Sequence, residues 1–92
     1  MKKYKKQMID VLSFIEFLVN NLNLSTSVKI KARELLEKNK GMLSKKDSKT
    51  LASALVYISA TLCGERRTYK EVGNVLKVSS VSISKTVKHL NI

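Results

Sequence analysis

The hydrophobic pattern of this chain is most distinctive between Ser48 and Gly64, where residues are apolar or small on every side. No residue from Thr50 to Cys63 is charged. Leucine and valine supply bulk here, whereas alanine and serine keep other faces small. A helix without a polar face is buried among other helices, and small residues let those helices approach closely. The pattern therefore predicts a central helix wrapped by amphipathic ones, and the run is too short to span a bilayer.

An amphipathic helix is predicted before this segment, from residue 7 to about residue 21. Its apolar side chains recur at the three- and four-residue spacing of one helix face. They are Met8, Val11, Leu12, Ile15, Leu18, Val19 and Leu22, and Ile9, Phe14 and Phe17 widen the stripe. The width predicts partners on more than one side, with both phenylalanines in the core. Residues 1–6 are expected to form a frayed basic tail.

A second helix is predicted to start at Ser25 or Thr26, because either hydroxyl can cap it. Its expected inward side chains are Val28, Ile30, Ala32, Leu35 and Leu36. Asn39-Lys40-Gly41 is the expected stop, since glycine tolerates the left-handed conformation at a helix end. After a connection over residues 41–47, Ser48 is the expected cap of the central helix and Gly64 its end.

Two short helices are predicted after residue 67. Thr68 and Glu71 have the spacing of a capping box, in which each side chain bonds the other's backbone N–H. The box starts a helix over residues 69–77, and a tight connection leads to a fifth helix over about residues 80–90. Because no strand pattern occurs, the predicted fold class is all-α with five helices.

Residues 69–90 also have the spacing of a helix-turn-helix. Gly73 is small where the two helices must cross closely, and Lys77 stands where many such motifs carry a glycine. At about 100° per residue, Ile83 on the second helix marks an inward face. The side chains on the opposite face are Val81, Ser84, Lys85 and Lys88. Ser79, Ser80 and Ser82 gather at the helix start, where hydroxyls and backbone N–H groups suit phosphate.

That outward face has the residue types that a helix in the DNA major groove needs. Val81 can touch a thymine methyl, Ser84 a base edge or phosphate, and Lys85 or Lys88 a phosphate or guanine. In the structural alternative the serines only cap the helix and the lysines only solvate it.

The net charge of +11 over 92 residues is confined to three regions. Residues 1–6, 38–49 and 64–92 each carry +4, and the rest is close to neutral. This distribution favours a polyanion as partner, nucleic acid first and an anionic membrane second. The alternative is lysine enrichment for solubility. A chain of this length makes one domain.

Catalytic, metal and cofactor patterns are missing from the sequence. The single cysteine, Cys63, excludes an intramolecular disulfide and a cysteine-built zinc site, and its place predicts a buried structural thiol rather than a reactive one. His89 is the only histidine, no carboxylates pair at a catalytic spacing, and no glycine loop could cradle phosphate. We therefore expect no enzyme and no cofactor. The N-terminus lacks a signal-peptide pattern, which favours the cytoplasm or the nucleus.

The segment Lys31–Leu90 resembles the second cyclin-like repeat of transcription initiation factor B, the archaeal counterpart of eukaryotic factor IIB. The most specific part is LCGERRTYKEV followed by VSSVSIS. The resemblance implies a five-helix cyclin-like fold over residues 7–92, with a helix-turn-helix over 69–90 that reads a promoter element in double-stranded DNA. It also implies contact with the TATA-binding protein and a role beside RNA polymerase.

Carried over by position, the resemblance adds site residues. Val81 matches the family residue that packs against a base, and Arg66 and Arg67 match a basic pair near the DNA backbone. Ser84 stands where the family usually has a base-contacting arginine. An arginine that makes two hydrogen bonds to guanine contributes about 1–3 kcal/mol to discrimination against the wrong base. Without it, a weak or altered sequence preference is expected.

Other parts of the family's full-length factor are missing: the zinc ribbon, the linker and the first repeat. The MKKYKK start favours a standalone protein that competes for one surface or acts as an accessory regulator, and the alternative is one domain of a longer protein. The main alternative function is a protein-interaction module, because the broad apolar stripe of the first helix can leave a patch for a partner. Attachment to an anionic membrane through the lysine-rich start is a further alternative.

Overall fold

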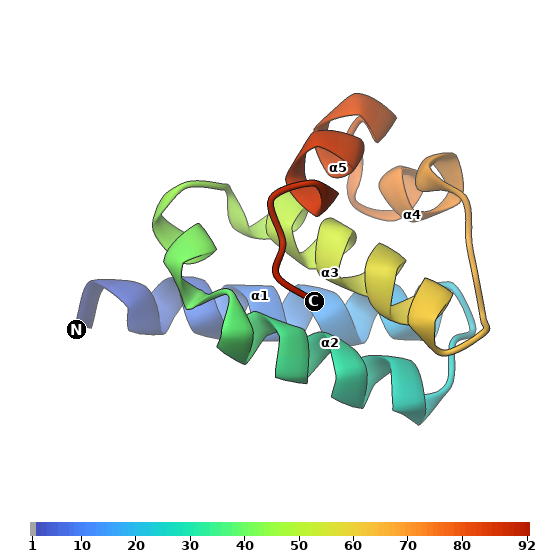
Figure 1. The fold of residues 1–92 in the computed structure, drawn as a ribbon, viewed down its shortest axis with the longest axis horizontal. Helices are drawn as coiled ribbons and strands as arrows, with labels where there is room; N and C mark the ends of the chain where they lie inside the picture. The colour runs from blue at the N-terminus through green and yellow to red at the C-terminus, as the bar shows by residue number, and fades with distance from the viewer. Residues whose placement is uncertain (1) are drawn as a thin grey trace.

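The computed structural model describes residues 2–92, with side chains from Lys6 onward, and its regular elements are all helices (Figure 1). Five α-helices follow in order: α1 (Lys2–Asn21), α2 (Thr26–Lys38), α3 (Ser48–Leu62), α4 (Tyr69–Leu76) and α5 (Ser80–Val87). A short 3-10 helix, η1 (Lys40–Ser44), lies between α2 and α3. The predicted all-α class with five α-helices is confirmed.

α3 is the helix on which the other elements pack. It crosses the middle of the fold in Figure 1, with α2 below it and α5 above it. It contacts α1, α2, α4, α5 and η1. Its fully buried residues are Leu51, Ala52, Ser53, Ala54, Leu55, Val56, Ser59 and Ala60. Because every face of α3 meets another element, a charge on it would lose its water, which explains the uncharged run. The predicted central helix is confirmed.

α1 and α2 each bury a narrower stripe than the sequence predicts. The fully buried residues of these helices are Val11, Ile15, Leu18, Val28, Ala32, Leu35 and Leu36. Ile30, predicted inward, is 52% exposed, and Phe17, predicted in the core, is 49% exposed. Phe14 packs partly buried against the core, whereas Ile9 is exposed. The prediction was wrong at Ile30 and Phe17 because neighbouring helices do not cover α1 and α2 on every apolar side.

Two helix starts also differ from prediction. α1 begins at Lys2, so residues 2–6 belong to the helix rather than to a frayed tail, in keeping with the good helix propensity of lysine. Met1 lies outside the described residues. Asp47 caps α3 in place of Ser48, since its carboxylate accepts the backbone N–H of Thr50 at 3.1 Å and the Thr50 hydroxyl at 2.7 Å. A carboxylate at this end also interacts favourably with the helix dipole.

The connection between α2 and α3 contains a short helix. α2 ends at Lys38 with Asn39 as its C-cap, so the predicted stop at Asn39-Lys40-Gly41 is confirmed, although Gly41 does not adopt the left-handed conformation that was expected of it. η1 follows at once and places Met42 and Leu43 in the core. Gly64 does end α3 with a left-handed φ of 76°, as predicted.

The loop from α3 to α4 is fastened to the turn between α1 and α2. The Glu65 carboxylate accepts hydrogen bonds from the Ser25 hydroxyl and from the Ser25 backbone N–H, the latter at 2.9 Å. Ser25 is the N-cap residue of α2, but its hydroxyl bonds Glu65 rather than the helix. Hydrogen bonds from the hydroxyl and the backbone N–H of Ser25, together with the nearby Arg67 charge, lower the pKa of Glu65. The loop is therefore held partly by an ionised carboxylate.

Acid is expected to weaken this contact and with it the fold. A carboxyl group whose pKa is lower in the folded state stabilises fully above its unfolded value, about 4.3 for glutamate, and less as pH falls through the folded value. We expect the urea midpoint of the wild type to fall below about pH 4.3. Glu65→Gln should be less stable than the wild type at neutral pH, and its urea midpoint should fall less on acidification. Ser25→Ala should also show a smaller fall of the urea midpoint at acidic pH. Two variants with the wild-type pH dependence would exclude this contact as its source.

Candidate nucleic-acid interface

α4 starts with the predicted capping box. The Thr68 hydroxyl accepts the backbone N–H of Glu71 at 3.0 Å, and the Glu71 carboxylate accepts the backbone N–H of Thr68 at 2.8 Å. This reciprocal pair satisfies two N–H groups that the helix itself cannot bond. Val72, Gly73 and Leu76 are buried, so the short helix presents one side to the core. α4 ends at Leu76, one residue before the predicted end.

The turn between α4 and α5 depends on Gly73. A Cβ atom on Gly73 would lie 2.3 Å from the backbone carbonyl oxygen of Val78. The Val78 N–H in turn donates to the Gly73 carbonyl oxygen at 2.9 Å. The predicted close approach at Gly73 is therefore confirmed. Lys77 has a left-handed φ of 62°, which explains why glycine is common at this place in such motifs.

α5 has one buried and one exposed face, as the helical period predicted. Ile83 is fully buried, Val87 packs partly buried against the core, and Leu90 just beyond the helix is also buried. The Ser79 hydroxyl accepts the Ser82 backbone N–H at 3.1 Å and donates to the Ser82 hydroxyl at 2.9 Å. These two serines therefore do the capping that the structural alternative assigned to them, whereas Ser80 is exposed. α5 ends at Val87, short of the predicted Leu90.

The predicted outward side chains gather around one shallow hollow. Val81 is 62% exposed, Lys85 and Lys88 are exposed, and Ser84 is half-buried. The hollow has a volume of about 360 Å³, and its lining residues are Tyr69, Ser80, Val81, Ser84, Lys85 and Lys88. We call this set the α5 face. None of its residues is acidic, so its electrostatic character is basic.

Tyr69 is the member of the α5 face that the sequence did not indicate. Its ring stacks on the Tyr57 ring of α3, with centroids 4.1 Å apart and planes at 15°. Partial burial and the neighbouring Tyr57 hydroxyl raise the pKa of Tyr69, while Ser84 acts in the opposite direction. Tyr69 therefore connects the α5 face to the core helix. No short-range pattern could have indicated it, because the stacking partner lies twelve positions earlier in the sequence.

The two arginines before the capping box have different surroundings. Arg66 is exposed. Arg67 donates through its guanidinium to the backbone carbonyl oxygens of Glu65 and Leu22, both at 3.0 Å, and of Arg66 at 3.3 Å. It therefore links the loop before α4 to the end of α1. This structural role was not predicted.

Comparison with known proteins gives the family. The family model described as transcription factor TFIIB repeat matches residues 4–91. Transcription initiation factor IIB from Pyrodictium occultum is 33% identical over 90 residues, which cover 96% of this chain and 29% of the relative. Transcription initiation factor IIB from Haloarcula vallismortis is 32% identical over 81 residues, covering 86% and 71%. The chain belongs to the TFIIB repeat family.

This TFIIB repeat is shorter than most of these relatives. Transcription initiation factor IIB 3 from Halobacterium salinarum is 35% identical over 79 residues, which cover 84% of this chain. The chain spans 29% of the Pyrodictium relative and 25% of the Halobacterium relative. No solved structure gives a significant match.

Family membership confirms three expectations. The resemblance to factor B and the all-α cyclin-like fold agree with the TFIIB repeat match. The relatives are transcription initiation factors rather than enzymes, so the expectation that this TFIIB repeat is not an enzyme is also confirmed.

Other kinds of site are not found in the described part of the TFIIB repeat. Between residues 2 and 92, no three His, Cys, Asp or Glu side chains are grouped so as to hold a metal ion. No helix described there is both long and apolar enough to cross a membrane. Cys63 is only partly buried, so it is more accessible than the buried thiol that was predicted.

Proposed function

We propose that this TFIIB repeat acts in transcription initiation or its regulation by binding double-stranded DNA, with α4 and α5 as a helix-turn-helix. The observation that carries the proposal is the convergence of Val81, Ser84, Lys85 and Lys88 on one exposed hollow, while Ile83 behind them is buried. An α-helix about 10–12 Å across fits the major groove, which is about 12 Å wide. α5 is the helix that would enter it.

Each residue of the α5 face has a proposed role. Val81, near the start of α5, would touch a thymine methyl, and Ser84 would meet a base edge or a phosphate. Lys85 and Lys88 would bind phosphates along the groove, and Ser80 would add a hydroxyl at the helix start. Ser79 and Ser82 would shape the start of α5 instead of meeting a phosphate through these groups, because the Ser79 hydroxyl accepts the Ser82 backbone N–H and donates to the Ser82 hydroxyl.

The expected sequence preference is weak. Ser84 has one hydroxyl where the resemblance to factor B implies an arginine, and a hydroxyl cannot make the bidentate contact to guanine. Phosphate binding does not depend on that side chain. We therefore propose that charge supplies most of the affinity of this TFIIB repeat.

Arg66 extends the proposed contact toward the start of α4. Its exposed guanidinium is available to a backbone phosphate. Arg67 would act indirectly, because its hydrogen bonds to Leu22 and Glu65 hold the loop that presents Arg66. The TATA-binding protein and RNA polymerase are proposed as further partners on the family resemblance.

A second candidate function is that of a protein-interaction module. It is favoured by a mainly apolar groove of about 370 Å³ between α1 and α2, beside which Ile30 is exposed. The groove is lined by Met8, Leu12, Ile30, Arg33, Glu34, Leu36 and Glu37. In this case the TATA-binding protein would be the partner, and DNA affinity would be absent or incidental.

A salt titration of duplex binding separates the two functions. We expect a generic duplex to bind with about micromolar or tighter affinity at low salt, with log affinity falling linearly against log salt. Lys85→Ala/Lys88→Ala should flatten the slope by about two, since each lost phosphate contact accounts for about 0.9. Fluorescence anisotropy of a labelled duplex at several salt concentrations measures both quantities.

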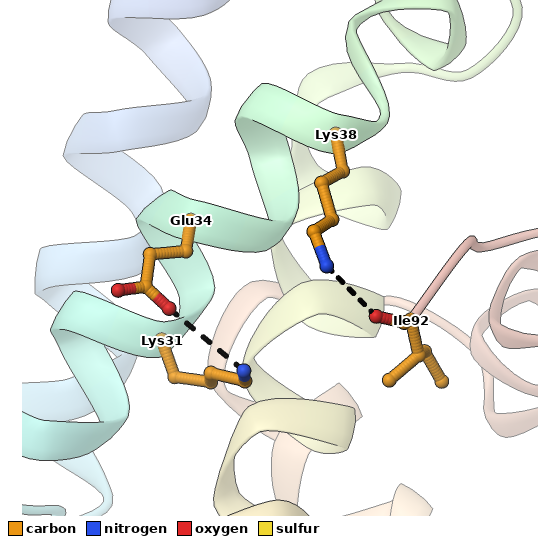
Figure 2. Close-up of polar contacts among 4 residues, drawn as sticks. All are labelled: Lys31, Glu34, Lys38 and Ile92. Carbon is orange, nitrogen blue, oxygen red and sulfur yellow. Dashed lines mark hydrogen bonds and ion pairs between the residues drawn. The ribbon is translucent and has the colours of Figure 1, made fainter.

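The matched control removes the same charge elsewhere. Lys29→Ala/Lys31→Ala lies on α2, on the other side of α3 from α5 (Figure 1). Figure 2 shows Lys31 beside Glu34. The two side chains form a partly exposed ion pair at 3.8 Å, which contributes little energy. The control should keep the wild-type slope. Undetectable binding, or equal slopes for both double variants, would favour the interaction module, and a selection from random duplexes with and without TATA-binding protein would then identify the partner.

A further inference from the structure

A second basic hollow lies at the far end of α5, outside the α5 face. It has a volume of about 420 Å³ and is lined by Met42, Lys45, Lys46 and His89. Met42 belongs to η1, the two lysines follow η1, and His89 follows α5, so the fold brings together segments more than forty positions apart. We call this set the η1–α5 hollow. Its volume is within the range of about 300–1,000 Å³ that is usual for ligand sites.

The end of the chain is held against η1 by a buried asparagine. Asn39, at the junction of α2 and η1, accepts the backbone N–H of Asn91 at 2.8 Å and donates to the Asn91 carbonyl oxygen at 3.0 Å. Lys38 donates to the carbonyl oxygen of Ile92 at 3.1 Å, as Figure 2 shows. These bonds hold the chain two and three residues after His89. His89 lines the same hollow as Lys45 and Lys46.

The side chains that line this hollow are positive or neutral. A smaller hollow of about 230 Å³ adjoins it and shares Met42, Lys45 and His89. Among the described residues that line either hollow, none is acidic. The nearest acid in sequence, Asp47, uses its carboxylate to cap α3 through Thr50. The residues of this hollow are therefore suited to binding an anion.

The position of the η1–α5 hollow relates it to the proposed DNA contact. A recognition helix enters the major groove with its N-terminal residues at the bases. Its C-terminal end then lies at the mouth of the groove, where the phosphates are. The η1–α5 hollow adjoins that end, because Lys88 belongs to the α5 face and His89 lines the hollow.

We propose that the η1–α5 hollow is a second phosphate-binding site, which takes backbone phosphodiester groups of the same DNA that the α5 face contacts. Lys45 and Lys46 would supply the charge, and His89 a hydrogen bond from its ring. This inference rests on the proposed DNA binding and extends its footprint from α5 to the segment after η1. It also gives a function to part of the +4 charge of residues 38–49.

The test is the salt titration carried out on Lys45→Ala/Lys46→Ala. At about 50 mM salt, the variant should bind duplex roughly tenfold more weakly for each lost phosphate contact. Its slope of log affinity against log salt should flatten by about 0.9 for each contact. Lys45→Gln/Lys46→Gln keeps most of each side-chain stem and should give the same result. Thermal melting followed by circular dichroism checks that both variants fold.

Two comparisons make the outcome decisive. The Lys29→Ala/Lys31→Ala control should keep the wild-type slope. If Lys45→Ala/Lys46→Ala also keeps it and only Lys85→Ala/Lys88→Ala flattens it, the second site is overturned and the proposed function stands. If wild type does not bind duplex at all, the proposed function fails and the inference fails with it.

Inorganic phosphate separates a DNA site from a site for a small free anion. Duplex added to the wild type should shift the NMR signals of the His89 ring, and the shift should shrink in Lys45→Ala/Lys46→Ala. A shift with inorganic phosphate but none with duplex would overturn the assignment to DNA.

Discussion

Replacing Gly73 with alanine should destabilise this TFIIB repeat by about 1–3 kcal/mol or more, because the new methyl group would overlap a backbone atom. The added Cβ would lie 2.3 Å from the Val78 carbonyl oxygen and 3.3 Å from Cδ1 of Ile83. The isoleucine can adjust, but the carbonyl belongs to the turn that joins α4 to α5. Urea unfolding followed by circular dichroism should show a lower midpoint, and duplex binding should weaken in the same variant as α5 is displaced.

The other two glycines are matched controls for Gly73→Ala. Gly41 has no atom within 4 Å of the position of an added Cβ, so Gly41→Ala should change stability by no more than about 0.5 kcal/mol. Gly64 has similar space but a φ of 76°, so Gly64→Ala should cost about 1 kcal/mol through backbone strain alone. The expected order of destabilisation is Gly73, then Gly64, then Gly41. A Gly73→Ala variant as stable as Gly41→Ala would contradict the turn geometry.

Truncating Leu55 to alanine should have the other large effect, a loss of about 2–5 kcal/mol in the free energy of unfolding. Leu55 is fully buried near the middle of α3, and α3 packs on every other helix. The cavity would be surrounded by several elements at once, so no single side chain could relax to fill it. Urea unfolding gives the loss directly, and an unchanged m-value would show that the unfolded state is not altered.

Leu62 is the matched control on the same helix. Leu62 is 49% exposed in the last turn of α3. Leu62→Ala therefore removes the same atoms as Leu55→Ala, but these atoms bury much less apolar surface. Its expected effect is within about 0.5 kcal/mol. Equal losses for the two variants would mean that the middle of α3 is not the centre of the core.

The parts of the fold that could be predicted from the sequence are those with strong local signals. The uncharged run on α3 needs no tertiary knowledge, since a charge inside a core is too costly to occur unpaired. The capping box at Thr68 and the small residue at Gly73 are likewise encoded within a few positions. Ser48 was predicted as the cap of α3 because serine is a common cap, but Asp47 is another, and only the backbone geometry decides between them.

The errors arose where burial depends on distant elements. Ile30 lies on an apolar position of α2, yet no neighbouring helix covers it, and the sequence of α2 alone does not contain that information. Phe17 is similar on α1. The lysines at residues 2–6 were interpreted by their charge as a tail, although lysine is also a good helix former.

The candidate site, like the fold, could be predicted only where the signal is local. The helical period of α5 predicts one outward face with Val81, Ser84, Lys85 and Lys88, and these four residues do line one hollow. Tyr69 joins them only through its stacking on Tyr57, and Arg67 bonds to Leu22 across the fold. The η1–α5 hollow depends on contacts between residues about fifty positions apart, which no local pattern encodes.

The buried amide of Asn39 has a consequence for ligand affinity. The Asn39 side chain donates to the carbonyl oxygens of Leu35, in α2, and of Asn91, and it accepts the backbone N–H of Asn91. One side chain therefore satisfies backbone groups of two segments that lie far apart in the sequence. Because Asn91 is held, the backbone at His89 loses its conformational freedom when the protein folds rather than when a ligand arrives. In the proposed phosphate site, an anion that binds at Lys45, Lys46 and His89 would therefore be spared the entropic cost of ordering the backbone at His89.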